Sequence, residues 1–178
     1  MITLGLFILL IISQGVLLDK ANDQWWKILI PFYGEYSMYK IARKKALWFV
    51  KFIIAILATI VLIVLLVNFV GTFIQTMSSY VPSISTNQTL LPETSVEIIN
   101  VLIENIISNQ VLIISFLLLS MFSLVSDIIR IVYYVGLSHS FGKSGVFAVG
   151  LFFLNVIFLP ILAFSKDAEY VGNEELIE

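Results

Sequence analysis

The stretch ALWFVKFIIAILATIVLIVLLVNFVGTFI, residues 46–74, decides the fold class of this chain. Apart from Lys51 near its start, Asn68 is its only strongly polar residue. The stretch is longer than the ~20 residues that a helix needs to cross the hydrocarbon core of a bilayer. In water, a helix of this kind would expose apolar faces too large for a soluble protein. The stretch therefore predicts a transmembrane helix, which tilts or protrudes because of its length.

The composition extends this prediction to the whole chain. Hydrophobic residues make up 60% of the 178 residues and charged residues 12%, against about one half and one quarter in soluble domains. A soluble domain of this size cannot bury so many aliphatic side chains. We therefore expect an all-α integral membrane protein that forms a single membrane domain over residues 1–178, with the lipid bilayer around it.

Three further apolar stretches predict the other spans. Residues 2–18, 111–133 and 146–164 are each about long enough to cross the bilayer, which gives about four transmembrane helices. The first stretch has no basic residue before it and no small-residue cleavage site after it, so we expect a retained span and not a signal peptide. The alternative for 146–164 is a re-entrant segment around Asn155 and Pro160, which returns the acidic tail to the cytoplasm.

Two segments between the spans are predicted to be amphipathic. Residues 24–45 are too polar to span and rich in Trp, Tyr and Lys, which settle at the level of the lipid headgroups. Pro31 and Gly34 are expected to break this segment into two short interfacial helices. The outer loop, 75–110, holds no Lys or Arg, and its second half predicts an amphipathic helix. Polar side chains at helical spacing on that helix form a candidate partner surface: Glu97, Asn100 and Glu104.

The basic residues predict the orientation. Short cytoplasmic loops are enriched in Lys and Arg, and most basic residues lie between positions 20 and 51. We therefore expect a multi-pass protein of the cytoplasmic or inner cell membrane, with the first loop inside and, for four spans, both termini outside. The formal glycosylation sequon at 87–89 falls on the outer loop. One basic cluster either binds anionic lipid or serves only as a topology signal: Lys40, Arg43, Lys44 and Lys45.

The third predicted span carries a polar face. Five residues follow three- and four-residue steps and so share one side of the helix: Ser120, Ser123, Asp127, Arg130 and Tyr134. Ionisable residues inside a membrane usually have a partner or a role. Arg130 lies near the expected inner interface, where it can extend toward headgroups and pair with Asp127. A structural pair is the favoured interpretation, and the serines are more typical of close helix packing than of a conduction path.

Motifs for catalysis and cofactors are incomplete. A phosphate-binding loop ending in Gly142-Lys143-Ser144 needs a glycine at position 137, which is Leu137. One His and no Cys leave a zinc site without ligands. A triad of Ser138 or Ser140 with His139 and Asp127 can be drawn, but Ser and His are often neighbours in a turn by chance. We expect no enzyme activity, no catalytic residue, no cofactor, no metal, no nucleotide and no nucleic-acid partner.

Two segments resemble a family of small, uncharacterised bacterial integral membrane proteins with the patterns W..LIP.YN and FGK..GF..GL.FLP.IF.PILAF. The first segment is WKILIPFYG at 26–34, with Gly34 where the pattern has Asn, and the second runs from Phe141 to Gly172. Similar segments occur in membrane regions attached to signal-peptidase-like proteins. The resemblance implies a bacterial membrane protein and supplies no activity.

These observations predict a non-enzymatic integral membrane protein. We expect an accessory or partner-binding subunit of a membrane assembly of the transport, secretion or immunity type, which contacts another membrane protein or a second copy of itself. The alternative is a small homo-oligomeric channel or transporter that uses the polar face of the third span.

Overall fold

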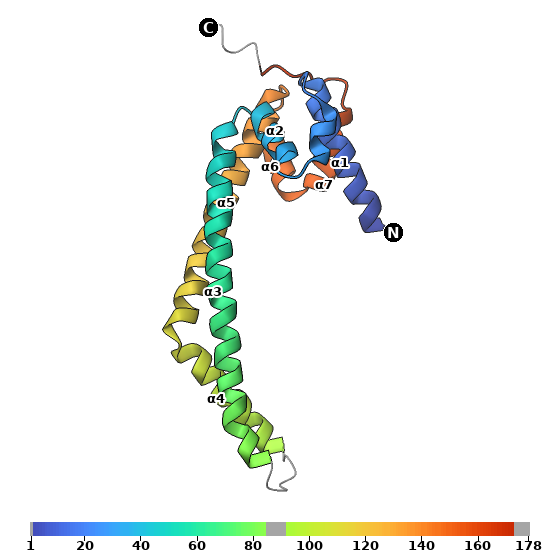
Figure 1. Ribbon diagram of the computed structural model, residues 1–178. Coiled ribbons are helices and arrows are strands. Elements are labelled where there is room, and N and C mark those ends of the chain that lie inside the picture. Colours follow the sequence, from blue (N-terminus) through green and yellow to red (C-terminus); the bar gives the residue numbers. More distant parts are fainter. Residues whose placement is uncertain (1, 85–91, 173–178) are drawn as a thin grey trace. The chain divides into compact units, whose positions relative to one another are not determined.

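The computed structural model describes residues 2–84 and 92–172, and in these ranges every regular element is a helix (Figure 1). This confirms the all-α class. The elements in chain order are α1 (Ile2–Lys20), the 3-10 helix η1 (Trp25–Leu29), α2 (Tyr33–Ile41), α3 (Lys45–Ile84), α4 (Pro92–Ser108), α5 (Gln110–Ser140), α6 (Gly145–Phe153) and α7 (Asn155–Phe164).

Three helices in the described ranges are long and apolar enough to cross a membrane: Thr3–Lys20, Lys45–Ser78 and Gln110–Ser140. None of the most apolar stretch of α3 is buried inside the protein. Its side chains therefore need lipid around them, because water would make this exposure very unfavourable. The protein is membrane-embedded, and the helices expected at 2–18, 46–74 and 111–133 are present. Helix α3 continues to Ile84 and α5 to Ser140, through residues expected to be loop or linker.

The expected continuous span at 146–164 is not formed. The helix stops at Phe153, and Leu154, with φ −127° and ψ 47°, separates α6 from α7. At 1.5 Å per residue, helices of 9 and 10 residues are each only about half as long as a ~30 Å hydrocarbon core is thick. The break lets α7 pack on α6: the Phe158 ring lies directly over Gly150, where an added Cβ would come within 2.4 Å of it.

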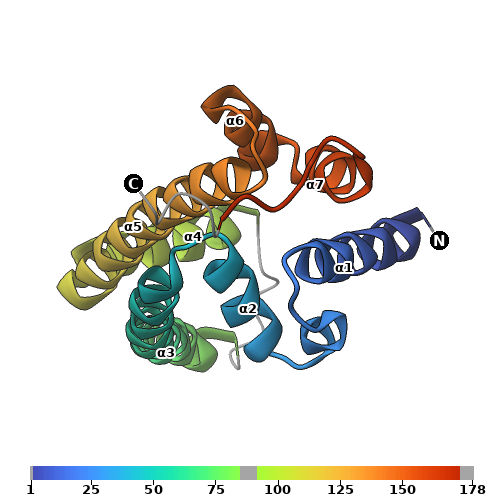
Figure 2. The same cartoon turned by 90° about the horizontal axis from the view of Figure 1, so that it is seen from above.

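The described chain divides into two compact units. The first unit contains the residues up to Ile53 and those from Val125 onward, and the second contains Ile54–Leu124. In the first unit, α1 packs against α7, η1 and α2, and α6 packs against α7. Figure 2 shows these helices of the first unit grouped around one another.

The segment at 24–45 contains two short helices, η1 and α2, as expected. Pro31 lies at the break between them, but Gly34 lies inside α2 and does not end a helix. The absence of a side chain at Gly34 serves close packing, since an added Cβ would come within 2.7 Å of the Ile28 Cα.

Three helices of the first unit end in the same way. In α1, α2 and α5, one backbone N–H donates to the carbonyl five residues back and the preceding N–H donates three residues back, as in a Schellman motif. The five-residue bonds run from Asp23 to Leu18, from Lys44 to Tyr39 and from Lys143 to Ser138. The residue at the left-handed position of each turn is Asn22 (φ 55°), Arg43 (φ 58°) and Gly142 (φ 66°), respectively.

The core of the first unit lies between these helices. Leu17 and Leu18 of α1, Leu137 of α5, and Leu151 and Leu162 of the α6–α7 pair are fully buried. The segment after α7 closes over one end of this core. The Lys20 ammonium donates to the carbonyls of Ser165 (2.6 Å) and Ala168 (3.1 Å), and Ala168 is itself buried. The chain thus enters α6 beside the end of α5 and leaves α7 beside the end of α1.

The second unit contains polar contacts between helices. Asn105 of α4 donates to the hydroxyl of Thr76 (3.1 Å), and Asn109 donates to the hydroxyl of Thr72 (3.2 Å). Both threonines also donate to carbonyls four residues back on α3. These hydrogen bonds tie the segment around residues 105–109 to α3, since polar groups in an apolar environment need partners.

Candidate functional site

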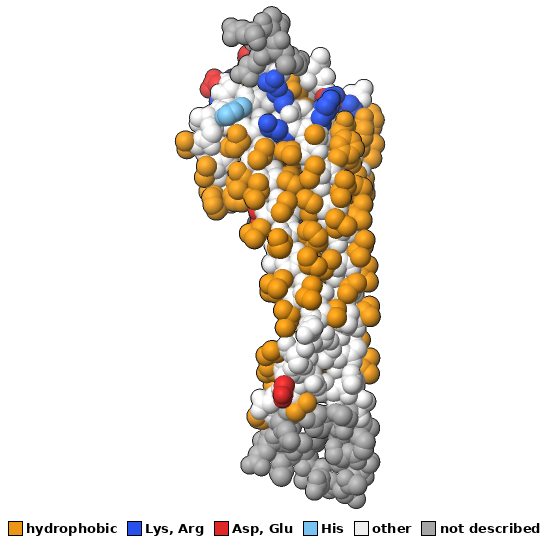
Figure 3. All heavy atoms as spheres, turned by 90° about the vertical axis from the view of Figure 1, so that its left-hand side faces the viewer, with side chains coloured by type: hydrophobic (Ala, Val, Ile, Leu, Met, Phe, Trp, Pro, Cys, Tyr) orange, Lys and Arg blue, Asp and Glu red, His pale blue; other side chains and the backbone are white. Residues whose placement is uncertain are grey.

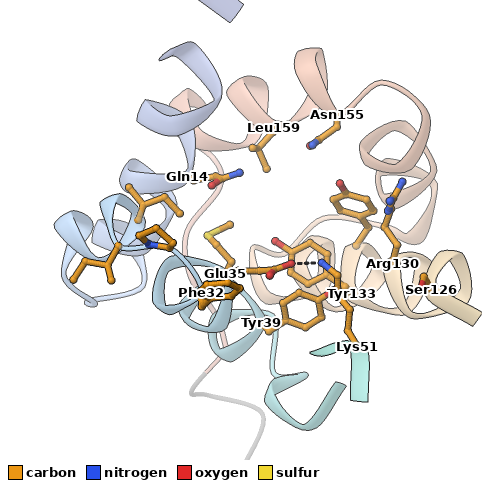
Figure 4. A pocket seen from close by; sticks show the side chains of 15 residues that line it. Gln14, Phe32, Glu35, Tyr39, Lys51, Ser126, Arg130, Tyr133, Asn155 and Leu159 are labelled. Atoms are coloured by element: carbon orange, nitrogen blue, oxygen red, sulfur yellow. Dashed lines mark hydrogen bonds and ion pairs between the residues drawn. The ribbon is translucent and has the colours of Figure 1, made fainter. Parts of the chain in front are cut away.

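A cavity of about 360 Å³ lies inside the first unit, and polar side chains from five helices line it (Figure 4). Gln14 comes from α1, Glu35 and Tyr39 from α2, and Lys51 from α3. Helix α5 supplies Ser126, Arg130, Tyr133 and Tyr134, and α7 supplies Asn155. Apolar side chains complete the wall, including Phe32, Met38 and Leu159. The elements that form this cavity are thus far apart in the sequence.

An ion pair between Glu35 and Lys51 lies in this cavity. Glu35 is in the first turn of α2, where the positive end of the helix dipole favours a carboxylate. Lys51 enters from α3 and also lies over the ring of Tyr39, 5.7 Å from its centroid. The Lys51 side chain is 38% exposed and that of Glu35 is 42% exposed, so the pair contributes at most about 1 kcal/mol to stability by itself.

Arg130 adds a second cation to the cavity wall. Its guanidinium is 3.9 Å from the Asp127 carboxylate, at i and i+3 of the same helix. The expected pair is therefore present, and both side chains remain about half exposed. The two cations, Lys51 and Arg130, each have a carboxylate partner, Glu35 and Asp127 respectively, so the group is formally neutral and offers charges of both signs to an occupant.

Tyrosines form one side of the cavity. The rings of Tyr39 and Tyr133 stack with centroids 4.4 Å apart, and Tyr133 lies 5.0 Å from Tyr134. Burial raises the pKa of the Tyr39 hydroxyl to about 12. Tyr39 is therefore neutral at physiological pH, and its hydroxyl can both donate and accept a hydrogen bond.

Asn155 is held at the cavity by the break between α6 and α7. Its Oδ1 atom is buried and has no hydrogen-bond partner among the described residues. Figure 4 shows Asn155 and Leu159 reaching from α7 and Gln14 from α1 on the side opposite to the Glu35–Lys51 pair. Buried polar atoms normally have a partner, so the Asn155 oxygen marks a position where a bound group would gain a hydrogen bond.

The cavity includes only part of the predicted polar face. Arg130 and Tyr134 line it, whereas Ser120 and Ser123 belong to the second unit and are exposed. The Ser120 hydroxyl donates to the carbonyl of Leu117 (2.7 Å). Gln14, Glu35 and Lys51 were not predicted as site residues. A usable signal was present, because each is a polar residue inside or just beside an apolar stretch.

The predicted basic cluster is divided in the structure. Lys40 pairs with Asp23 at 3.2 Å, and Lys45 is exposed. Arg43 and Lys44 line a second cavity of about 280 Å³ together with His139. Figure 3 shows Lys and Arg side chains gathered above a belt of hydrophobic ones at this end of the first unit. Such a distribution is typical of a headgroup interface.

Asn100 and Glu104 of the candidate partner surface are exposed on α4. The side chain of Glu97 and the sequon at 87–89 lie outside the described residues. In the part of the chain that the structure describes, no three His, Asp or Glu side chains gather as metal ligands would.

Comparison with known proteins gives one match. No curated protein and no solved structure is significantly similar to the chain. A family described as a family of unknown function (DUF5684) matches residues 26–92 and 94–173. These ranges begin inside η1 and extend over α2 and the helices that follow, and thus hold most of the cavity lining. The chain therefore belongs to this family of unknown function (DUF5684).

Proposed function

We propose that this protein is a non-enzymatic integral membrane protein that serves as a binding subunit of a membrane assembly, with the cavity of the first unit as its binding site. The observation that carries the proposal is the convergence of Glu35, Lys51 and Arg130 on one cavity in a chain with few charged residues. Charged side chains at membrane depth are costly and usually serve a ligand or a partner.

The depth of the cavity supports this proposal. Gln14 and Lys51 are each six residues from the basic ends of α1 and α3, at Lys20 and Lys45, or about 9 Å along the helix. Arg130 is ten residues from the end of α5, or about 15 Å. The cavity therefore lies just beneath the level of the basic residues. A small polar solute could reach it from the headgroup region.

The charged side chains at the cavity select the occupant. Arg130 and Lys51 can hold an anionic group, while Glu35 and the Asn155 oxygen can accept hydrogen bonds from an ammonium group. We propose a small anionic or zwitterionic solute, of a size that fits about 360 Å³. The lining residues that the structure describes include no His and no Cys, and we propose binding as the activity of the cavity.

The membrane orientation follows from the same residues. We propose the cytoplasmic or inner cell membrane, with the basic end of the first unit in the cytoplasm. The α6–α7 pair is then a re-entrant hairpin and not a fourth span, because the segment after α7 is tied to Lys20 at the same end as the start of α6. The exposed polar residues Asn100 and Glu104 would face an assembly partner on the opposite side of the membrane.

The test is ligand-induced stabilisation of the detergent-purified protein. Glycerol 3-phosphate, glycine and choline serve as anionic, zwitterionic and cationic probes. We expect the first or second to raise the melting temperature, and Arg130→Gln to remove the shift. Lys45→Gln, which removes an exposed cation outside the cavity, should retain it. Stabilisation by choline alone, or equal shifts in all three proteins, would contradict the proposal.

A small homo-oligomeric transporter is the second candidate, because Arg130 and Tyr134 of the polar face line the cavity. Flux of the stabilising probe into proteoliposomes separates the two candidates. A transporter should lose flux in Arg130→Gln, whereas a binding subunit reconstituted alone should bind the probe and show no flux.

A further inference from the structure

One polar side chain of the α6–α7 hairpin has no role in the local fold. Asn155 is the only residue with a polar side chain between Gly145 and Phe164. It lies at the start of α7, where asparagine commonly caps a helix, but no side chain caps α7. Its Oδ1 atom is buried and has no hydrogen-bond partner among the described residues. Because such an atom is destabilising, the hairpin alone does not explain why an asparagine is present here.

Two other asparagines show how the fold engages an amide in apolar surroundings. Asn109 lies at the start of α5, and its Oδ1 accepts a hydrogen bond from the Val111 N–H (3.1 Å) while its Nδ2 donates to the Thr72 hydroxyl (3.2 Å). Asn68, inside α3, donates to the carbonyl four residues earlier (2.8 Å). Both amides thus pair with their own helix or its neighbour. The contrast indicates that the Asn155 oxygen serves a group outside the chain.

The group that pairs with this oxygen has to come from the larger cavity. Asn155 lines that cavity, of about 360 Å³, and Figure 4 shows its side chain reaching in from α7. The two cations of the cavity are engaged elsewhere, because Lys51 pairs with Glu35 and Arg130 with Asp127. A carbonyl oxygen only accepts hydrogen bonds. An occupant that pairs with Oδ1 therefore presents an N–H or O–H group.

The surroundings of the Asn155 amide favour an amine with hydrogen on its nitrogen. Gln14 of α1 lies on the same side of the cavity (Figure 4) and carries a second amide oxygen. Leu159, one turn further along α7, is only 2% exposed and lines the same cavity. Apolar neighbours strengthen a hydrogen bond made here and make an unpaired acceptor more costly. An amine N–H satisfies an amide oxygen, whereas a quaternary ammonium group has no hydrogen to donate.

From these observations we propose that Asn155 selects the occupant of the cavity by accepting a hydrogen bond from an ammonium N–H. The inference rests on the proposed function, since it concerns the same cavity, and it narrows the ligand to zwitterions whose nitrogen still carries hydrogen. Primary, secondary and tertiary ammonium groups qualify, and quaternary ones do not. The selection arises because a ligand without the donor leaves the buried oxygen unpaired.

The experiment removes the N–H groups of a zwitterion one at a time. The full-length protein in an uncharged detergent is titrated by calorimetry with glycine, sarcosine, N,N-dimethylglycine and glycine betaine. Each step adds one methyl group, but only the last step removes the final N–H. We expect the dissociation constant to change gradually over the first three ligands and to rise about tenfold at betaine, as the loss of one charge-assisted hydrogen bond predicts. A gradual change that continues through betaine would overturn the proposal.

Asn155→Leu is the decisive variant, because leucine is similar in shape and suits an apolar hairpin. We expect the step at betaine to disappear and the melting temperature of the ligand-free protein to rise, since a buried acceptor without a partner is removed. Asn68→Leu is the matched control. It replaces an amide of α3 that donates within its own helix, and it should retain the step at betaine. A step that persists in Asn155→Leu would overturn the role of Asn155.

The same titrations separate this inference from the proposed function. Equal binding of N,N-dimethylglycine and betaine would leave the cavity a site for zwitterions and refute only the selection by Asn155. Failure of all four ligands and of glycerol 3-phosphate to bind would refute the proposed function, and the selection with it.

Discussion

Gly150→Ala tests whether residues 145–164 form a hairpin or a straight span, because the two arrangements predict opposite signs. In the hairpin, the new methyl group would come within 2.4 Å of Phe158 Cε1 and 2.6 Å of its Cδ1 and Cζ. The ring cannot withdraw freely, since it packs edge-to-face on Phe147 with centroids 5.2 Å apart. Overpacking of this kind costs about 1–3 kcal/mol, and the better helix propensity of alanine returns about 0.5–1 kcal/mol.

The hairpin therefore predicts a net loss of up to about 2.5 kcal/mol in the free energy of unfolding. In a straight helix, Phe158 would lie about 12 Å along the axis from residue 150, out of contact with the new methyl group. The same substitution would then stabilise the protein by about 0.5–1 kcal/mol.

The assay is unfolding by SDS in mixed micelles, followed by the loss of helical circular dichroism. Gly71→Ala is the matched control, because it lies inside α3 and an added Cβ there has nothing within 4 Å. It should be neutral or slightly stabilising. Phe158→Leu, added to Gly150→Ala, should recover part of the loss, since residues in contact are energetically coupled. A stabilising Gly150→Ala, similar to Gly71→Ala, would refute the hairpin.

Two further predictions concern the basic end of the first unit. Burial raises the pKa of Asp23, but hydrogen bonds from Lys27, the Gln24 N–H and Lys40 outweigh this effect and bring the pKa below its ordinary value of 3.8. Asp23→Asn should therefore cost about 1–2 kcal/mol at neutral pH, and the difference from wild type should disappear as the pH falls below 3.8 through the folded-state value. SDS titrations at neutral and acidic pH measure this, and a pH-independent difference would contradict it. Lys20→Met removes the bonds to Ser165 and Ala168 and should accelerate trypsin cleavage after Lys166 several-fold by local opening. Lys45→Met is the control, and equal cleavage rates would show that Lys20 does not anchor this segment.

The linear pattern of apolar residues determined the fold class and the three long helices. A single apolar run such as 46–74 is stable in a bilayer as a helix, because the hydrogen bonds within a helix satisfy all of its backbone groups there. The pair of Asp127 and Arg130 was predictable for the same reason, since residues three apart on a helix are neighbours whatever surrounds it. The break at Pro31 was also a local effect, whereas Gly34 was misread because its lack of a side chain serves contact with Ile28 and not a turn.

Only the tertiary structure decided what happens at 146–164 and where the site lies. Residues 146–164 are apolar throughout, so their composition fits a straight span as well as a hairpin. The choice is made by Phe158 packing on Gly150 and by Lys20 binding the carbonyls that follow α7. Similarly, Gln14, Glu35, Lys51 and Asn155 are isolated polar residues in the sequence and come together only when five helices surround one cavity. The reason is physical: burial in lipid depends on each segment's own composition, while a binding site depends on distances between segments, which the order of residues along the chain does not specify.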